Sequence, residues 1–338
     1  MKSILLALTS AAVLSATAVT TAVSAADTPS PAAFDAAIKN NSLAVSPDER
    51  LAAVCNSDAD RVIIYDLPSG KPLRTLTGFV TPRNIVYSPD GKRLYVSDSS
   101  LGTVAVIDAA SFETVARYPI GFGAFGTTLS ADGRVLYVNS QAASTVTVVD
   151  TANGAAQAVI PGFAQPRQGI RLSPDGKTVY VTNFLGDKVT IVDVATHKIA
   201  GEITGFKQLR AISVTKDGKT LFAANSGSNE IAVVDLAKRE IVKRVPVGQD
   251  PYGAALTPDG RFVFSGNKVD NSLSIVDTAT LTVVGTVTGF NEPRQAIVFS
   301  KDGKSAYVLN KDLSVSVVDL ASRSITKTLT PGTAAAAR

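Results

Sequence analysis

Residues 173–183 read Ser-Pro-Asp-Gly-Lys-Thr-Val-Tyr-Val-Thr-Asn and combine two kinds of local signal. Proline presets the φ angle that a tight turn needs, and glycine supplies the positive φ that closes such a turn. The residues from Thr178 to Thr182 are mainly β-branched and aromatic, and such residues favour a strand. The stretch therefore predicts a tight hairpin turn that leads into a β-strand.

The same turn recurs along the whole chain. Its aspartate occurs seven times at intervals of 42 or 43 residues, as Asp48, Asp90, Asp132, Asp175, Asp217, Asp259 and Asp302. Each repeat holds four short apolar runs separated by polar loops, which is the pattern of a propeller blade. The sequence therefore predicts an all-β, seven-bladed β-propeller with four antiparallel strands per blade, formed by residues 42–331.

Loop lengths predict which strand of each blade lies at the centre. One connection per blade must cross from the outermost strand to the innermost strand of the next blade, about 14 Å when neighbouring strands lie ~4.8 Å apart. Only the stretches before the first strand of each repeat, such as residues 78–83, are long enough. We therefore expect the first strand at the central axis. Small residues on these strands agree, because seven strands converge there: Gly126, Gly169, Ala211, Gly253, Ala254 and Ala296.

Short segments at the end of the second strand resemble the signature of a known repeat family. Residues 180–183 read Tyr-Val-Thr-Asn, and residues 95–98, 137–139 and 307–310 are close variants. The chain thus resembles the YVTN-repeat, or YncE-like, propellers over nearly all of residues 42–330. The resemblance implies a seven-bladed propeller in an exported protein, and YncE-like proteins have been associated with single-stranded DNA. WD40 propellers are a worse match, because the chain has no tryptophan.

Cationic and aromatic residues recur just before the first strand. This position holds Arg83, Arg167, Arg210, Arg294, Phe125 and Tyr252. We expect all six near one mouth of the central channel, on the face that also carries the loops between second and third strands, here called the connection face. The hairpins lie on the opposite, turn face. Like charges that converge on one channel need a partner, so the cluster predicts an anion-binding site. The alternative is that each arginine bonds loop carbonyls or a neighbouring carboxylate.

Two further sets of residues recur once per repeat or nearly so. A phenylalanine opens five of the long connections: Phe79, Phe122, Phe163, Phe206 and Phe290. These rings either fill the gaps between blades or stack on a ligand. An aspartate ends every third strand and is expected to form an Asx turn: Asp66, Asp108, Asp150, Asp193, Asp235, Asp277 and Asp319.

Composition argues against several kinds of chemistry. The chain has one histidine, His197, in a predicted turn-face hairpin, and one cysteine, Cys55, at the end of a strand. A site with histidine or cysteine ligands and a histidine-based catalytic triad are therefore disfavoured, and we expect no cofactor and no metal. The sequence also shows no acid–base pair, so whether the protein is an enzyme stays open, with catalysis disfavoured.

Three functions remain. The first is a non-catalytic propeller that binds an anionic small molecule, peptide or protein partner at the channel mouth. The second is a single-stranded DNA-binding propeller, for which the net charge of +4 is low. The third is a lactonase- or lyase-like enzyme that acts at the channel mouth, as other seven-bladed propellers do.

The sequence at the two ends of the chain predicts export and two terminal segments outside the propeller. Residues 1–25 have the pattern of a cleavable signal peptide, with Lys2 before an apolar run and small residues before the cleavage site after Ala25, or after Ala26. We therefore expect a periplasmic or secreted monomer without a membrane span. Residues 26–41 read as a linker that could add a strand to the last blade, and residues 332–338 as a flexible tail.

Overall fold

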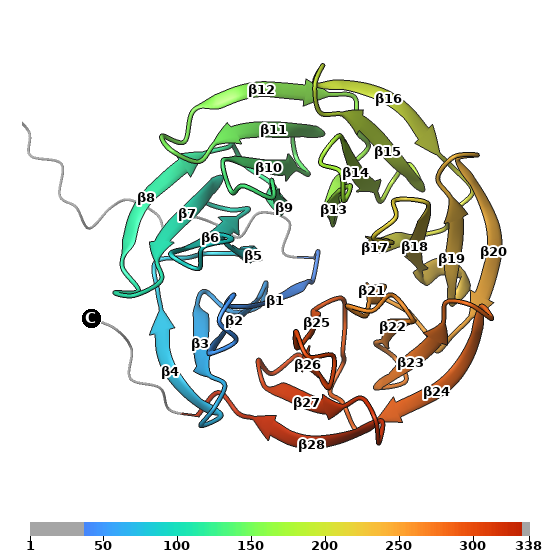
Figure 1. The fold of residues 1–338 in the computed structure, drawn as a ribbon. Helices are drawn as coiled ribbons and strands as arrows, with labels where there is room; N and C mark the ends of the chain where they lie inside the picture. Colours follow the sequence, from blue (N-terminus) through green and yellow to red (C-terminus); the bar gives the residue numbers. More distant parts are fainter. Residues whose placement is uncertain (1–36, 333–338) are drawn as a thin grey trace, which may run out of the picture. The chain divides into compact units, whose positions relative to one another are not determined.

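Seven four-stranded antiparallel sheets surround a central axis (Figure 1). This computed structural model describes residues 37–332, which form 28 strands and one short 3-10 helix, Ser226–Ser228. Each sheet consists of four strands that are consecutive in the chain, so each repeat forms one blade. The predicted seven-bladed β-propeller is confirmed.

The strands are short and similar in length from blade to blade. The first strands are β1 (Asn41–Val45), β5 (Pro82–Tyr87), β9 (Ala124–Leu129), β13 (Pro166–Leu172), β17 (Leu209–Val214), β21 (Ala255–Leu256) and β25 (Ile297–Phe299). The second strands are β2 (Leu51–Asn56), β6 (Arg93–Asp98), β10 (Val135–Ser140), β14 (Thr178–Asn183), β18 (Thr220–Asn225), β22 (Phe262–Asn267) and β26 (Ser305–Leu309). The third strands are β3 (Val62–Asp66), β7 (Thr103–Asp108), β11 (Thr145–Asp150), β15 (Lys188–Asp193), β19 (Glu230–Asp235), β23 (Ser272–Asp277) and β27 (Val315–Asp319). The fourth strands are β4 (Lys71–Leu76), β8 (Thr114–Pro119), β12 (Ala156–Pro161), β16 (Lys198–Ile203), β20 (Glu240–Pro246), β24 (Thr282–Thr288) and β28 (Ser324–Leu329).

The first strand of every blade lies at the axis and the fourth lies outside, as the loop lengths predict (Figure 1). Space at the axis is short. A Cβ atom added at Gly169 would lie 2.7 Å from the backbone oxygen of Arg210 in the next blade. One added at Gly253 would lie 3.0 Å from the backbone oxygen of Arg294. Glycine at these positions therefore allows neighbouring inner strands to approach each other closely.

The turn-face hairpins share one hydrogen-bond pattern. In the fourth repeat, the Ser173 hydroxyl donates to Asp175 and accepts from the backbone N–H of Thr178 at 2.9 Å. The aspartate in turn accepts from the backbone N–H of Lys177 at 3.1 Å. The hydroxyl-to-aspartate bond occurs in all seven hairpins. The predicted Asx turns at the ends of the third strands are also present, since each of those aspartates accepts a backbone N–H two or three residues further on.

The hydrophobic core lies between blades. Seven clusters of buried apolar residues each join two adjacent sheets, one at each blade interface. Burial raises the pKa of the Cys55 thiol, which lies in the cluster between the first two blades. Cys55 is therefore a core residue.

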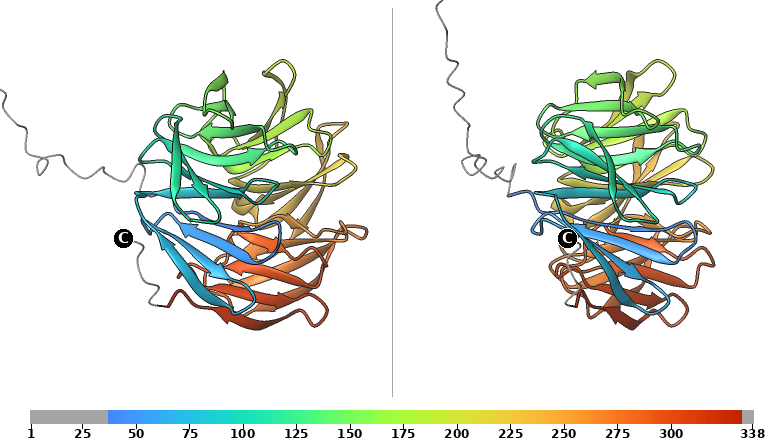
Figure 2. Two further views of the ribbon diagram at one scale, coloured as in Figure 1. Left: turned by 60° about the vertical axis from the view of Figure 1, so that its left-hand side comes forward. Right: turned by 90° about the vertical axis from the view of Figure 1, so that its left-hand side faces the viewer.

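The ring closes by packing between the first and last blades, which are neighbours in both views of Figure 2. The last blade contains only its own four strands, and the described residues before β1 add none to it. Tyr65 donates a hydrogen bond to the backbone oxygen of Leu313 at 2.8 Å, and Asn41 donates to that of Leu309 at 3.2 Å. Closure therefore uses the same kind of interface as every other pair of blades.

Other predictions concern the ends of the chain. The signal peptide, most of the linker and nearly all of the tail lie outside the described residues. Residues 37–40 lead into β1, which begins at Asn41. Within the described range, no helix is both long enough and apolar enough to span a membrane.

Candidate functional site

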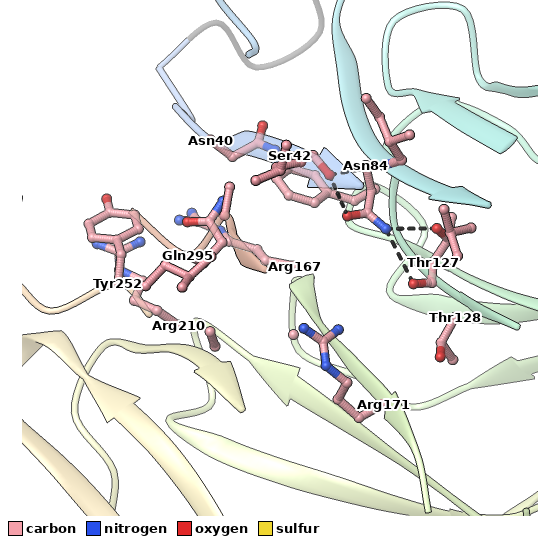
Figure 3. Close-up of a pocket in the computed structure, with 18 of the residues that line it drawn as sticks. Asn40, Ser42, Asn84, Thr127, Thr128, Arg167, Arg171, Arg210, Tyr252 and Gln295 are labelled. Carbon is pink, nitrogen blue, oxygen red and sulfur yellow. Dashed lines mark hydrogen bonds between the residues drawn. The ribbon is translucent and has the colours of Figure 1, made fainter. Parts of the chain in front are cut away.

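A cavity of about 320 Å³ lies among the inner strands, and all seven blades contribute to its lining (Figure 3). This volume is at the lower end of the range for small-molecule sites. Ser42, Asn84 and Thr127 form a chain of hydrogen bonds along one side, where the Asn84 amide accepts from Ser42 at 3.1 Å and donates to Thr127 at 2.7 Å. Tyr252 and Arg210 lie together on the other side.

The cavity brings together four of the six residues predicted for the channel mouth. Its lining includes Phe125, Arg167, Arg210 and Tyr252. A hydrogen bond from the Tyr252 backbone N–H to the Gly266 oxygen, 2.9 Å long, fixes the tyrosine three residues before β21. That these side chains bind a ligand stays a prediction.

Arg83 and Arg294 lie outside the lining and are almost fully buried, with 1% and 5% of their surface exposed. Arg83 donates to the backbone oxygen of Ile38 at 2.6 Å and to the side-chain oxygen of Asn40 at 3.0 Å. These two acceptors precede β1, so the start of the propeller covers Arg83. For Arg83 the structure therefore matches the alternative, in which the guanidinium bonds loop carbonyls.

Arg294 also matches the alternative, because its guanidinium lies beside a carboxylate. Its guanidinium lies 3.6 Å from Glu292, which also pairs with Lys311 at 2.6 Å. The hydrogen bond from Lys311 lowers the pKa of the Glu292 carboxyl below its ordinary value, and the charge of Arg294 lowers it further. The group is therefore ionised at neutral pH and balances part of the positive charge beside the mouth.

The arginines at the mouth stack on aromatic rings. The guanidinium of Arg167 lies 3.5 Å from the centre of the Phe184 ring, and that of Arg210 lies 4.6 Å from the same ring. Arg210 also lies 4.4 Å from the centre of the Tyr252 ring, so it stands between two aromatic side chains. Such contacts hold a guanidinium in place without neutralising its charge.

The lining of the cavity is cationic. It contains Lys39, Arg167, Arg171 and Arg210, and among the described residues it contains no aspartate, glutamate or histidine. Lys39 pairs with Asp58 outside the lining. Within residues 37–332, Arg210 has no carboxylate within 4 Å, and its one hydrogen bond goes from Nε to the Ser226 hydroxyl at 3.0 Å. The site can therefore stabilise a negative charge.

Three charged or stacking residues of the site were missed from the sequence, namely Lys39, Arg171 and Phe184. Phe184 directly follows the Tyr-Val-Thr-Asn segment, in a loop that the strand alternation places on the connection face. Its position could have been found by that argument. Arg171 lies within β13, two residues before the turn serine, and only its difference from the other repeats distinguishes it.

The phenylalanines of the long connections pack between blades in four of five cases. Phe79, Phe163, Phe206 and Phe290 are buried. Phe122 is the exception, with 65% of its surface exposed. A continuous ring of aromatic platforms is therefore absent from the described connection face.

Comparisons with known proteins agree with the fold. A family model described as lactonase, seven-bladed β-propeller, matches residues 37–240, well over half of the chain. The chain belongs to this lactonase family. A second model, described as the cytochrome D1 haem domain, matches residues 186–296 of this lactonase-family propeller. No match was found among curated proteins.

A solved structure shares the architecture. The chain is similar to one from the hydrazine synthase of Kuenenia stuttgartiensis, with a TM-score of 0.75 and 22% sequence identity. The match covers 82% of the lactonase-family chain and 95% of the other. At this identity the likeness shows the fold alone.

The cavity offers few ligands to a haem iron. Haem iron is held by histidine, cysteine, methionine or tyrosine side chains. The only histidine, His197, is in the hairpin between β15 and β16 on the turn face, and the only cysteine, Cys55, is buried in the core. Neither lines the cavity, and Tyr252, the one lining residue of a haem-ligand type, has its ring against the guanidinium groups of Arg210 and Arg294.

Proposed function

We propose that this propeller binds an anionic small molecule in the cavity at the mouth of its channel. The observation that carries the proposal is the charge of the lining, which has three arginines besides the paired Lys39 and, within residues 37–332, no acidic side chain. Arg210 and Arg167 would bind the anion, since a guanidinium offers several donors to a carboxylate or phosphate. Tyr252 and Phe184 would hold these guanidinium groups in position.

Binding is favoured over catalysis because, among the described residues, the lining has no histidine, aspartate or glutamate that could act as a base. Lactone hydrolysis needs a base that activates water, or a metal ion in its place. Among the described residues, no group of three histidine, cysteine, aspartate or glutamate side chains could hold a metal. Tyr252 is the one lining residue with a hydroxyl group of the acid–base type.

A lactonase activity is the second candidate, supported by the family match over residues 37–240. We propose it as the alternative that experiments must distinguish from binding alone. Hydrolysis of a lactone panel above the buffer rate, lost in Tyr252→Phe, would replace the binding proposal with this one.

The single-stranded DNA alternative rests on the YncE-like resemblance and has less support. Four of the five connection phenylalanines are buried and offer no face to a base. We propose further that binding takes place in the periplasm or outside the cell, because residues 1–25 have the pattern of a signal peptide.

The test is calorimetric titration with a panel of small carboxylates at low ionic strength. Wild type is compared with Arg210→Gln, Arg167→Gln and the control Arg134→Gln, which removes an arginine from the turn face, where its side chain is 85% exposed. Loss of a charged hydrogen-bond pair predicts about tenfold or weaker binding in each cavity variant. The control should bind like wild type, and equal losses in all three variants would reject the proposal.

A further inference from the structure

Arg171 is the one charged side chain in its ring of inner-strand positions. Two residues before the turn serine or threonine, the other six blades carry small or apolar side chains, namely Ala44, Val86, Thr128, Ser213, Ala255 and Val298. These residues lie on the first strands, which surround the axis, or at their ends. Arg171 thus places a single positive charge inside the channel.

The surroundings of Arg171 leave this charge without a counterion. Its one hydrogen bond in the described structure goes from Nη1 to the neighbouring Ile170 oxygen at 2.8 Å. No carboxylate of residues 37–332 lies within 4 Å of it. Arg171 is an exposed residue that lines the cavity, so its guanidinium is accessible to a ligand there.

The same cavity joins Arg171 to the arginines of the mouth. Figure 3 shows the Arg171 side chain extending from β13 into the cavity that Arg167 and Arg210 also line. Arg167 and Arg171 are four residues apart on β13, or roughly 13 Å at ~3.3 Å per residue before side-chain reach is counted. The register shift sets Pro166 opposite Asn183 and Ile170 opposite Val181, so four residues of β13 span two residues of β14. The backbone separation of the two arginines is therefore about 10 Å or less at ~3.3 Å per residue. Two positive positions thus follow each other along one cavity.

We propose that the ligand is an elongated dianion with an acidic group at each end. One group would be bound by Arg167 and Arg210 at the mouth, and the other by Arg171 inside the channel. This inference rests on the proposed function and extends it from one anionic group to two. Within residues 37–332, neither Arg210 nor Arg171 has a carboxylate within 4 Å, so a ligand with a single charge would neutralise only one of these two guanidinium groups.

The test uses α,ω-dicarboxylates from succinate to dodecanedioate, each paired with the monocarboxylate of equal chain length. In the wild-type protein, binding should peak at one chain length, where the dicarboxylate binds about tenfold more tightly than its partner. Arg171→Gln should weaken binding of that dicarboxylate about tenfold more than binding of the monocarboxylate, so that the difference between the two ligands disappears. Arg171→Lys should retain part of the difference.

Separate measurements test whether each variant is folded and which of the two proposals holds. Thermal unfolding of each variant shows whether the propeller is intact, and Arg134→Gln repeats the charge change outside the cavity. Monocarboxylate binding that depends on Arg210, with no advantage for any dicarboxylate, would overturn this inference alone. The same holds if Arg171→Gln weakens both ligands equally. Absence of binding by every carboxylate would overturn the proposed function as well.

Discussion

At the scale of single residues, the mouth of the channel uses aromatic rings to hold arginines in place. Arg210 lies between Phe184 and Tyr252, at 4.6 Å and 4.4 Å from the two ring centres. A carboxylate would hold the guanidinium as firmly but would also neutralise it. An arginine that is held by rings keeps its charge for a ligand.

Replacement of Tyr252 tests this role. Tyr252→Ala removes one of the two rings beside Arg210 and should weaken binding of the best carboxylate about fivefold, because a cation–π contact contributes about 1 kcal/mol. Tyr252→Phe keeps the ring and should bind within about twofold of wild type. Dissociation constants from calorimetry check both values. Equal losses in the two variants would mean that the hydroxyl, rather than the ring, is required.

The single cysteine gives a clean probe of the native state. Cys55 has no exposed surface, and burial raises the pKa of its thiol, so the reactive thiolate is scarce in the folded protein. We expect no reaction with a disulfide reagent in native buffer and one thiol per chain in denaturant. Absorbance of the released thiol measures both, and rapid labelling of the native protein would contradict the buried position.

The site could be predicted only in part, and the reasons lie at this scale. Recurrence placed six residues near the mouth, but recurrence does not say what covers a side chain. Arg83 is buried by residues 38–40, which belong to no repeat. Arg171 was overlooked for the opposite reason, since it breaks the repeat and so produces no recurring signal.

At the scale of elements, the first turn-face hairpin differs from the other six. Glu49 has a φ of 59° at the position where the others have glycine. A side chain in this left-handed conformation costs about 1 kcal/mol or more. The Glu49 carboxylate accepts a hydrogen bond from the backbone N–H of Lys301 in the last blade, at 2.6 Å. The hairpin thus combines local strain with a contact that joins the two ends of the ring.

Two substitutions separate the strain from the contact. Glu49→Ala keeps the strain and loses the bond, so it should destabilise the protein by about 1 kcal/mol. Glu49→Gly loses the bond and relieves the strain, so it should be more stable than Glu49→Ala by about 1 kcal/mol. Denaturant unfolding measures both.

A control isolates the cost of the backbone conformation. Gly176 has a φ of 72°, and a Cβ atom added there meets nothing within 4 Å. Gly176→Ala should therefore cost about 1 kcal/mol from conformation alone. If Glu49→Ala matched the wild type, the bond to Lys301 would contribute nothing to closure.

The strands could be predicted from the sequence because the turn residues, the repeat length and the apolar pattern agree within each repeat. The inner strands of the last two blades are the exception, since β21 and β25 have only 2 and 3 residues. The prolines before them, Pro251 and Pro293, do not explain the difference, because Pro82 and Pro166 begin the full-length strands β5 and β13.

At the scale of the whole molecule, the seven hairpin aspartates predict how stability depends on pH. In each hairpin the bond from the serine or threonine hydroxyl, followed by a backbone N–H, lowers the pKa of the aspartate. A carboxyl whose pKa is lower in the folded than in the unfolded state adds stability above its ordinary pKa. That stability is lost as the pH falls through the lowered value.

We therefore expect the melting temperature to stay level from about pH 7 to about pH 5 and to fall steadily below about pH 4. Scanning calorimetry across this range measures the effect. Ser173→Ala removes the hydroxyl from one hairpin and should reduce the acid-dependent part of the loss slightly. A melting temperature that rises on acidification would contradict the lowered pKa values.

The central claim is that the cationic cavity among the inner strands binds an anion. The most direct measurement is a crystal structure of the protein with the carboxylate that binds most tightly in the titrations. The account predicts density for that ligand inside the cavity, with its carboxylate within about 3 Å of the guanidinium groups of Arg167 and Arg210. Density for the ligand on the turn face or against the outer strands, with only water beside these arginines, would contradict it.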